Sequence, residues 1–442
     1  MGLCGLLLVQ CFAVPERGCE DGSGLFVEYH LCMPAAEFAV VTVPTLVADL
    51  IPADFDGEGL ANDLAGLMYS GGGAVPDASA LVMRMRADLR EPGTLAVPLP
   101  LGTTGLTPVS AGSNRQDLVY VADPTNGEEV GIMGLIHNDD GTFAGPAIEH
   151  DLRGNVFLLG EYGCRAPRGV MTADKKASVL VSCEQNEPKR DMMGAVLYQG
   201  SDVGIVDLIA FESQAPNDYY AAAADPNVAG VHGSVLVDVD GDETLDGAGI
   251  SKPVEAADGK DRVAAEDHKV VVVAVPKGMF PKIYTVYVDE GPIEALYAAD
   301  LDGDGGPELI ARHLDHGLLT ILRQTTKGSF EYTVAQSLEV TQPVDVAVGD
   351  FTGDGALDIA VVHAVSDERL EAAVFIRAPD QGEGEYEYGF TAMGGVAGDE
   401  VATAIAALDV DDDDALDLAL AVLVPDKGTE IRVFLNRSAG PR

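Results

Sequence analysis

Residues 343–365 read PVDVAVGDFTGDGALDIAVVHAV, and this stretch decides the fold. Short runs rich in Val, Ile and Ala lie on both sides of a turn rich in Asp and Gly. Apolar runs of this length, bounded by turn residues, are typical of β-strands. Glycine permits the sharp backbone turn between them. The stretch therefore predicts two strands joined by an acidic turn, with acids at alternate positions of the turn.

The same unit recurs along the chain. Acidic turns begin near residues 54, 109, 170, 238, 300, 350 and 409, at intervals of 50 to 68 residues. The last four copies are strong, and the first is weaker because its final acid, Asp63, falls one residue late. The copies near 109 and 170 keep the spacing but lose most of the acids. Self-similarity at a period of this length indicates a repeat architecture.

Each copy contains four strand-like runs. The copy around residue 350 supplies them at 343–351, 358–365, 372–379 and 386–393. Four short strands per unit, repeated seven times, predict an all-β fold, a seven-bladed β-propeller of four-stranded antiparallel blades. A solenoid would need shorter repeats, and an array of β-sandwiches would need about a hundred residues per unit.

The two ends of the repeat region predict how the ring closes. The last copy supplies the runs VATAIAALDV, LDLALAVLV and EIRVFLNR and lacks a fourth. Residues 37–45, EFAVVTVPT, have strand character and no blade of their own. Because unpaired sheet edges are unfavourable, we expect 38–43 to complete the last blade beside EIRVFLNR. Alternation would place one of two sets against the neighbouring blade: Phe38, Val40 and Thr42, or Ala39, Val41 and Val43.

The pattern from Phe330 to Val362, with VAVGDFTGDGALDIAV at its centre, resembles the FG-GAP or VCBS repeat family. The resemblance covers about residues 38–442. The literal Phe-Gly and Gly-Ala-Pro signature is poor, and Phe143-Ala-Gly-Pro146 is its nearest approach, so the chain is more similar to the bacterial branch than to integrin α-chain heads. The resemblance implies calcium-binding blades of a seven-bladed propeller, as in many exported bacterial proteins.

The spacing of the acids predicts where metal would bind. Carboxylates at positions 1, 3 and 5 of a tight turn point toward one centre, and an acid at position 9 closes the cage. Several carboxylates in so short a turn repel one another unless a cation lies between them, so a role as simple turn formers is disfavoured. Ca2+ accepts about six to eight oxygens in flexible geometry, whereas Mg2+ demands a stiff octahedron.

We therefore expect four calcium sites and a fifth in the weaker first copy, each adding folding free energy to its blade. We expect no metal in the copies near 109 and 170. The expected ligands are Asp238, Asp240, Asp242 and Asp246; Asp300, Asp302, Asp304 and Glu308; Asp350, Thr352, Asp354 and Asp358; Asp409, Asp411, Asp413 and Asp417; and, for the fifth site, Asp54, Asp56, Glu58 and Asp63.

The charge of the chain limits its partners. Lys plus Arg number 27 and Asp plus Glu number 72, for a formal net charge of −45. Nucleic acid is excluded because phosphate binding needs a basic face, and adhesion to anionic lipid headgroups is disfavoured for the same reason. Apolar residues make up 47% of the chain, enough for a real core. We expect a protein or glycan ligand, which the sequence does not identify.

Residues 1–36 form a lead before the propeller expected over residues 37–442. The apolar run MGLCGLLLVQ is too short to span a bilayer, and no other segment is long and apolar enough to do so. The run resembles the apolar part of a bacterial signal peptide without its positive start. Leu8-Val9-Gln10-Cys11 loosely resembles a lipobox, although Gln10 departs from the usual small residue. We expect export to an extracellular, periplasmic or outer-surface location, with a lipid anchor at Cys11 as one form of attachment.

Six cysteines are present and none forms a Cys-x-x-Cys pair, which disfavours a zinc ribbon or a thioredoxin-like site. Cys19 with Cys32, and Cys164 with Cys183, lie close enough in sequence to bridge short loops in an oxidising compartment. Buried free thiols are the alternative.

No metalloprotease, serine-hydrolase, phosphate-loop or dinucleotide motif occurs. His313 and His316 could be ligands or a base, but a strand end and its following turn is the simpler interpretation. Arg84 and Arg86 would share one strand face and could bind an anion, although a solvated face is simpler. Asn436 begins a formal glycosylation sequon, which we interpret as chance.

The most economical function is a calcium-stabilised binding or adhesion scaffold. This role follows by analogy, because a fold does not determine a function. One alternative is a propeller enzyme, a lyase or hydrolase acting on polysaccharide or phospholipid, which a His converging with an Arg or Tyr would favour. The other is a structural subunit of a surface assembly, which a large exposed apolar patch would favour.

Overall fold

The computed structural model describes residues 38–436 with internal gaps, and residues 1–37 and 437–442 lie outside the described part. The predictions for the lead, for Cys11 and for the pair Cys19–Cys32 therefore fall outside the described residues. The longest internal gaps are 152–161, 213–228, 253–267 and 378–387.

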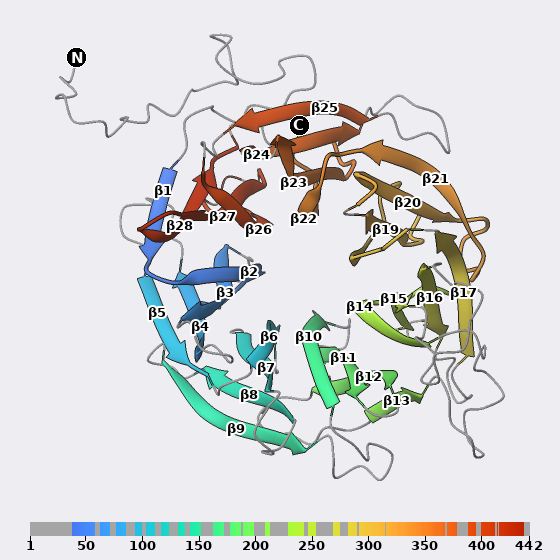
Figure 1. The fold of residues 1–442 in the computed structure, drawn as a ribbon, viewed down its shortest axis with the longest axis horizontal. Coiled ribbons are helices and arrows are strands. Elements are labelled where there is room, and N and C mark those ends of the chain that lie inside the picture. The colour runs from blue at the N-terminus through green and yellow to red at the C-terminus, as the bar shows by residue number, and fades with distance from the viewer. Residues whose placement is uncertain are drawn as a thin grey trace.

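Among the described residues, 28 strands form seven four-stranded antiparallel sheets that lie side by side around a common centre (Figure 1). The first three sheets consist of β2 (Leu46–Ala53), β3 (Asp63–Ser70), β4 (Asp77–Arg84) and β5 (Gly93–Pro98); β6 (Thr103–Ser110), β7 (Gln116–Ala122), β8 (Gly131–His137) and β9 (Phe143–Asp151); and β10 (Tyr162–Met171), β11 (Ala177–Asn186), β12 (Lys189–Tyr198) and β13 (Leu208–Glu212). The next three consist of β14 (Ala229–Val237), β15 (Asp246–Lys252), β16 (His268–Ala274) and β17 (Lys282–Asp289); β18 (Ala295–Ala299), β19 (Glu308–His313), β20 (Leu318–Gln324) and β21 (Tyr332–Glu339); and β22 (Pro343–Gly349), β23 (Asp358–Ser366), β24 (Arg369–Arg377) and β25 (Tyr388–Gly394). The all-β architecture of repeated antiparallel sheets is confirmed.

The seventh sheet joins the two ends of the described chain. It has the order β1 (Phe38–Val43), β28 (Gly428–Phe434), β27 (Asp417–Val424) and β26 (Val401–Leu408). Strand β1 pairs antiparallel with β28, and Phe38 lies opposite Val433. The predicted pairing is confirmed. Of the two sets that alternation allowed, Val41 and Val43 are the ones that pack against the neighbouring sheet.

In the other six sheets the strands pair in chain order, with the first strand nearest the common centre and the fourth outermost (Figure 1). Each strong or weak acidic turn joins the first strand of its sheet to the second. The repeat therefore places these turns at the same end of every sheet that carries one.

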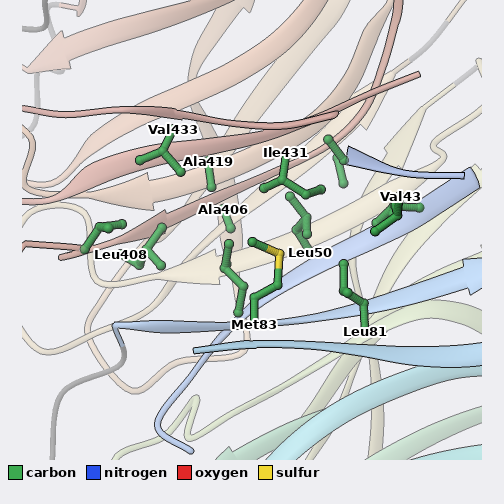
Figure 2. Close-up of a cluster of buried hydrophobic side chains, with 14 of the residues drawn as sticks. Val43, Leu50, Leu81, Met83, Ala406, Leu408, Ala419, Ile431 and Val433 are labelled. Carbon is green, nitrogen blue, oxygen red and sulfur yellow. The ribbon is translucent and has the colours of Figure 1, made fainter. Parts of the chain in front are cut away.

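Apolar side chains fill the seams between neighbouring sheets. Figure 2 shows one such cluster, in which Leu50, Leu81 and Met83 of the first sheet meet Ile431 and Val433 of the seventh. Four further clusters occupy the seams from β2–β5 to β6–β9, from β14–β17 to β18–β21, and onward to β22–β25 and the seventh sheet. Because the seventh sheet packs against a neighbour on both faces, β27 is apolar from Leu418 to Val424 instead of alternating.

The ladder of the third sheet bears on one cysteine prediction. Cys164 on β10 lies directly opposite Cys183 on β11. Residues opposite each other in an antiparallel pair have Cα atoms about 4.5–5.5 Å apart, which a disulfide can bridge. The placement agrees with the predicted pair, and the bond itself stays a prediction.

Candidate metal centre

The acidic turns share one backbone plan. Position 1 follows the first strand of the sheet directly, and position 9 is the first residue of the second strand. At position 4, Gly303 and Gly353 have φ values of 72° and 70°. Glycine reaches this left-handed region without strain, which lets the turn fold back on itself and bring alternate side chains together.

In three turns, carboxylates from three residues bring oxygen atoms within 4.8 Å of one another. These groups are Asp238, Asp240 and Asp246; Asp300, Asp302 and Asp304; and Asp409, Asp411 and Asp417. The structure thus unites the expected ligands of positions 1 and 3 in each case, together with position 5 or position 9. Asp242, Glu308 and Asp413 are not members of these groups. Acid groups of this density could hold a metal ion.

The turn 350–358 has a neutral oxygen at position 3. The Thr352 hydroxyl is buried and donates to Asp350 Oδ1 at 3.4 Å. Asp350 also accepts the backbone N–H groups of Gly353 at 2.7 Å and Gly355 at 2.8 Å. The acid at position 1 therefore organises the turn as well as offering oxygens to it. In the first copy Asp54 likewise accepts the Gly57 N–H at 2.7 Å, and Glu58 lies outside the described residues.

The acid at position 9 makes the same contact in all five acidic turns. Its carboxylate is buried and accepts a hydrogen bond from the backbone N–H of position 2. The pairs are Phe55 with Asp63 (2.8 Å), Val239 with Asp246 (3.0 Å), Leu301 with Glu308 (2.7 Å), Phe351 with Asp358 (3.0 Å) and Val410 with Asp417 (2.8 Å). Asp63 makes the contact although it falls one residue late. Position 9 is thus a clasp on the turn besides being an expected ligand.

Negative charge on the buried position-9 acids is unfavourable. Burial, reinforced by neighbouring acids, raises the pKa of Asp358 to about 7 despite two backbone hydrogen bonds that act in the opposite direction. The same causes raise the pKa of Asp417 to about 8. A cation bound between the carboxylates would remove this penalty.

One oxygen in turn 300–308 fits a bound cation directly. Asp300 Oδ1 is buried and has no hydrogen-bond partner, whereas Oδ2 of the same residue accepts the Gly305 N–H at 2.9 Å. A buried acceptor without a partner costs about 1–3 kcal/mol. The remaining donors in the group are carboxylate oxygens, which hard cations such as Ca2+ prefer. The residues present therefore fit the metal that the repeat implies.

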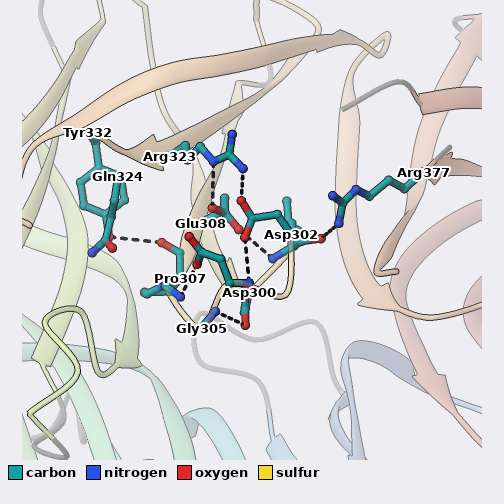
Figure 3. A network of polar contacts seen from close by, with 12 residues as sticks. Asp300, Asp302, Gly305, Pro307, Glu308, Arg323, Gln324, Tyr332 and Arg377 are labelled. Atoms are coloured by element: carbon teal, nitrogen blue, oxygen red, sulfur yellow. Dashed lines mark hydrogen bonds and ion pairs between the residues drawn. The ribbon is translucent and has the colours of Figure 1, made fainter. Parts of the chain in front are cut away.

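Two cationic side chains that were not predicted from the sequence lie beside turn 300–308, one on β20 and one in the turn after it. Figure 3 shows Arg323 beside the turn, where its guanidinium contacts the Asp302 carboxylate and its Nε lies 3.8 Å from Glu308 Oε1. The Lys327 ammonium donates to the carbonyl oxygen of Asp304. These groups partly balance the acids without metal.

Three polar residues each extend from their own sheet into the acidic turn of the preceding sheet. We call them the latch residues: Gln324, Arg377 and Asn436. Each donates from its side chain to the backbone carbonyl oxygen at position 2 of that turn. Gln324 bonds Val239 O at 2.7 Å, Asn436 bonds Phe351 O at 2.6 Å, and Arg377 bonds Leu301 O. Figure 3 shows Arg377 entering the neighbouring turn. These residues were not predicted from the sequence, where their only signal is a polar residue at or just after the end of the third strand of the sheet.

A second cluster lies at the opposite end of β19 from the acidic turn. His313 is fully buried, and neither ring nitrogen has a hydrogen-bond partner. Its Nδ1 lies 3.6 Å from Asp289 Oδ2, which accepts the Tyr287 hydroxyl at 2.6 Å. The ring of His316 is 6.3 Å away, centroid to centroid. Burial lowers the pKa of His313, which keeps the ring neutral. His313 ends a strand and His316 lies in the next turn, as expected.

The remaining candidates have plain structural places. Arg84 ends β4, and Arg86 lies outside the described residues. Asn436, the first residue of the sequon, is fully buried, and its side-chain amide donates a hydrogen bond to Phe351 O in the core. No helix suited to crossing a bilayer occurs in the part of the chain that the structure describes.

One comparison with known protein families covers two of the acidic turns. Residues 300–361 match the family model of the FG-GAP-like repeat. Among solved structures, the chain is similar to the α-L-arabinanase of Penicillium chrysogenum complexed with arabinobiose, at 11% identity and a TM-score of 0.45, covering 91% of this chain and 99% of that one. It is also similar to Sqt1 from Chaetomium thermophilum, at 11% identity and a TM-score of 0.47, covering 90% and 97%. No curated protein matches the sequence. Residues 300–361, which include the turns 300–308 and 350–358, therefore form an FG-GAP-like repeat.

Proposed function

We propose that this chain is an exported calcium-binding protein whose seven sheets close into a β-propeller that serves as a binding or adhesion scaffold. Its ligand is a protein or a glycan, and Cys11 is a candidate site of lipid anchoring. The observation that carries the proposal is the recurring acidic turn, with carboxylates at positions 1 and 3 grouped and the position-9 acid clasping position 2. The FG-GAP-like repeat at 300–361 supports the same assignment.

The proposed sites use oxygen donors from single turns. The groups headed by Asp238, Asp300 and Asp409 bring three carboxylates each together, whereas the acids of the turns at 350 and 54 form no such group among the described residues. When bound, Ca2+ would supply positive charge that balances the negative charge of the grouped carboxylates. The chain's own part is to hold the turn in place, through the position-9 clasp and the left-handed glycines. The metal is therefore a structural element, and its binding free energy adds to the stability of the fold.

Metal removal tests this proposal. We expect a strong chelator to lower the melting temperature of the full chain, and calcium to restore it more effectively than magnesium. Metal analysis of the reconstituted protein should show about four calcium ions per chain, as the four strong turns predict. A melting curve that is identical for metal-free and calcium-loaded protein would show that calcium has no structural role.

Truncation tests the proposed closure of the ring. Strand β1 (Phe38–Val43) is the only partner of the outer edge of β28 in the described residues. Removing residues 1–36 should leave a folded protein, whereas removing residues 1–45 exposes that edge and should lower stability and cause aggregation. Equal melting temperatures for the two truncated proteins would contradict closure through β1.

The cluster around His313 favours a second candidate function, an enzyme acting on polysaccharide or phospholipid. A buried neutral His beside an Asp that is itself held by Tyr287 resembles a general acid–base arrangement. Assays for lyase and hydrolase activity with these substrates, comparing the unaltered protein with His313→Gln, test it. Activity that His313→Gln abolishes while the melting temperature is retained would favour the enzyme, and absence of turnover in both proteins would leave the scaffold.

A further inference from the structure

Two latch residues contact two acidic turns at once. The Asn436 side chain donates to Phe351 O in turn 350–358 at 2.6 Å, and its backbone N–H donates to Asp417 Oδ1 in turn 409–417 at 2.6 Å. Arg377 repeats this arrangement one sheet earlier. Its guanidinium donates to Leu301 O in turn 300–308, and its backbone N–H donates to Asp358 Oδ1 at 2.8 Å.

The atoms touched are those that set the shape of each turn. At position 2, the N–H is held by the position-9 acid of its own turn, and the C=O is held by the latch residue of the next sheet. The peptide group that contains this carbonyl leads directly into position 3, where Thr352 or Asp302 offers a ligand oxygen. The latch therefore orients the peptide next to a proposed ligand, and its own backbone is oriented by the position-9 acid of the neighbouring turn.

The contacts of Asn436 with the two turns are buried, so they are not easily replaced by water. Asn436, Phe351 and Asp417 are each fully buried. The Asn436 amide also donates to Leu416 O at 3.0 Å, which fixes its direction. A buried donor or acceptor that loses its partner costs about 1–3 kcal/mol. A change in one turn that moves Asp417 must therefore move Asn436 or break one of its hydrogen bonds.

We infer that Asn436 and Arg377 couple metal binding between neighbouring turns, so that an occupied turn raises the calcium affinity of the preceding turn. This inference rests on the proposed function, because it presupposes that the turns bind calcium. The effect is reciprocal, since a coupling free energy between two sites acts equally on both. The chain of contacts runs from turn 409–417 through Asn436 to turn 350–358, and from there through Arg377 to turn 300–308.

Hydrogen exchange of single turns tests the coupling. Calcium is titrated into the metal-free full chain, and exchange is followed in the peptide that covers 350–358. Turn 409–417 is disabled by the double substitution Asp409→Asn and Asp411→Asn. We expect the calcium midpoint of the 350–358 peptide to rise about twofold to tenfold, the loss expected when about one hydrogen bond no longer helps binding. With Asn436→Ala, disabling turn 409–417 should no longer move the midpoint.

The same experiment is repeated at the seam between turns 350–358 and 300–308, so that the inference can still be tested if Asn436→Ala does not fold. There, Asp350→Asn with Asp354→Asn disables turn 350–358, the peptide covering 300–308 is followed, and Arg377→Met removes the latch. Lys427→Met is the matched control, because it also removes one positive charge but lies in an exposed pair with Glu430 at the far end of β27 and β28. This control should leave the coupling intact.

The outcomes separate the inference from the proposed function. Calcium protection of both peptides without any midpoint shift, while the latch residues are intact, overturns the coupling and leaves calcium binding standing. A shift that persists in Asn436→Ala and Arg377→Met shows that other contacts carry it and overturns the assignment to these residues. Calcium that protects no turn overturns the proposed function and the inference together.

Discussion

The neighbouring turns 300–308 and 350–358 follow one plan but balance their charge differently. Turn 300–308 has four acids, and Arg323 contacts two of them. Turn 350–358 has three acids and a neutral Thr352 at position 3. The negative charge of turn 300–308 is therefore partly balanced by Arg323, whereas turn 350–358 has one negative charge fewer.

The ladder shows why the second turn has no guanidinium at the same place. Leu309 pairs with Leu322, just before Arg323, and Ile359 pairs with Phe375, just before Ile376. The counterpart of Arg323 is thus Ile376, which belongs to the apolar core of the seam. Sequence repeats fix the positions of the acids, but the neighbouring strand decides how their charge is compensated. The two turns should consequently differ in how strongly they depend on calcium.

Replacing the position-9 acid should have the largest effect, and a larger one in turn 350–358. Asp358→Ala removes the acceptor of two backbone N–H groups, from Phe351 and Arg377, whereas Glu308→Ala removes the acceptor of the Leu301 N–H and an Arg323 contact. We expect Asp358→Ala to lower the free energy of unfolding by about 2–4 kcal/mol and Glu308→Ala by about 1–3 kcal/mol. Urea unfolding in saturating calcium measures both, and the reverse order would show that the clasp is not what distinguishes the turns.

Removing the internal counterion should have an intermediate effect that depends on metal. Arg323→Met leaves Asp302 and Glu308 without a guanidinium, so we expect it to destabilise the chelated protein by about 1–2 kcal/mol, a value reduced by the partial exposure of Arg323. In calcium the loss should shrink, because the metal replaces the missing charge. Lys427→Met, in an exposed pair, should change stability by less than about 0.5 kcal/mol in either condition. An equal loss with and without calcium would separate Arg323 from the metal site.

Neutralising position 5 should give the smallest effect, and one of opposite sign in the two turns. Asp304 and Asp354 each accept a backbone N–H through Oδ1, at 2.6 and 2.8 Å, and asparagine keeps that acceptor. In chelator, Asp354→Asn should raise the melting temperature slightly, since it relieves repulsion in a turn where Ile376 stands in the place of Arg323. Asp304→Asn should lower the melting temperature slightly, and both substitutions should change the free energy of unfolding by less than about 0.5 kcal/mol. Thermal melts of the pair side by side decide the point.

Much of the architecture could be predicted from the repeat. Apolar runs of strand length and Asp-Gly turns recur in frame, so strand number per unit, turn positions and the pairing of residues 38–43 with the C-terminal strand all follow from counting. The first copy shows how tolerant this reasoning is. Asp63 is one residue late, yet it clasps Phe55 as its counterparts clasp their own turns.

The contacts between sheets could not be predicted in the same way. Gln324 and Asn436 each bond a residue 85 positions away, and Arg377 bonds one 76 positions away, so no local pattern announces the partner. The same holds for the meeting of His313 with Asp289, which lies on the outer strand of the preceding sheet. Composition and spacing specify each repeat unit by itself. The partners of these side chains lie in the neighbouring unit and are defined only when the two units pack together.

The pairing of β1 with β28 has a mechanical consequence. Phe38 lies opposite Val433, so the chain segments before β1 and after β28 leave the sheet at the same end of an antiparallel pair. A pulling force between these two segments would load the hydrogen bonds one after another, in the unzipping geometry, instead of loading all of them together in shear. Bonds loaded singly yield at low force. A tether through the N-terminal segment that works against a load on the C-terminal segment would therefore peel β1 away first, while the seams packed by Ile431, Leu50 and their neighbours would still bear little strain.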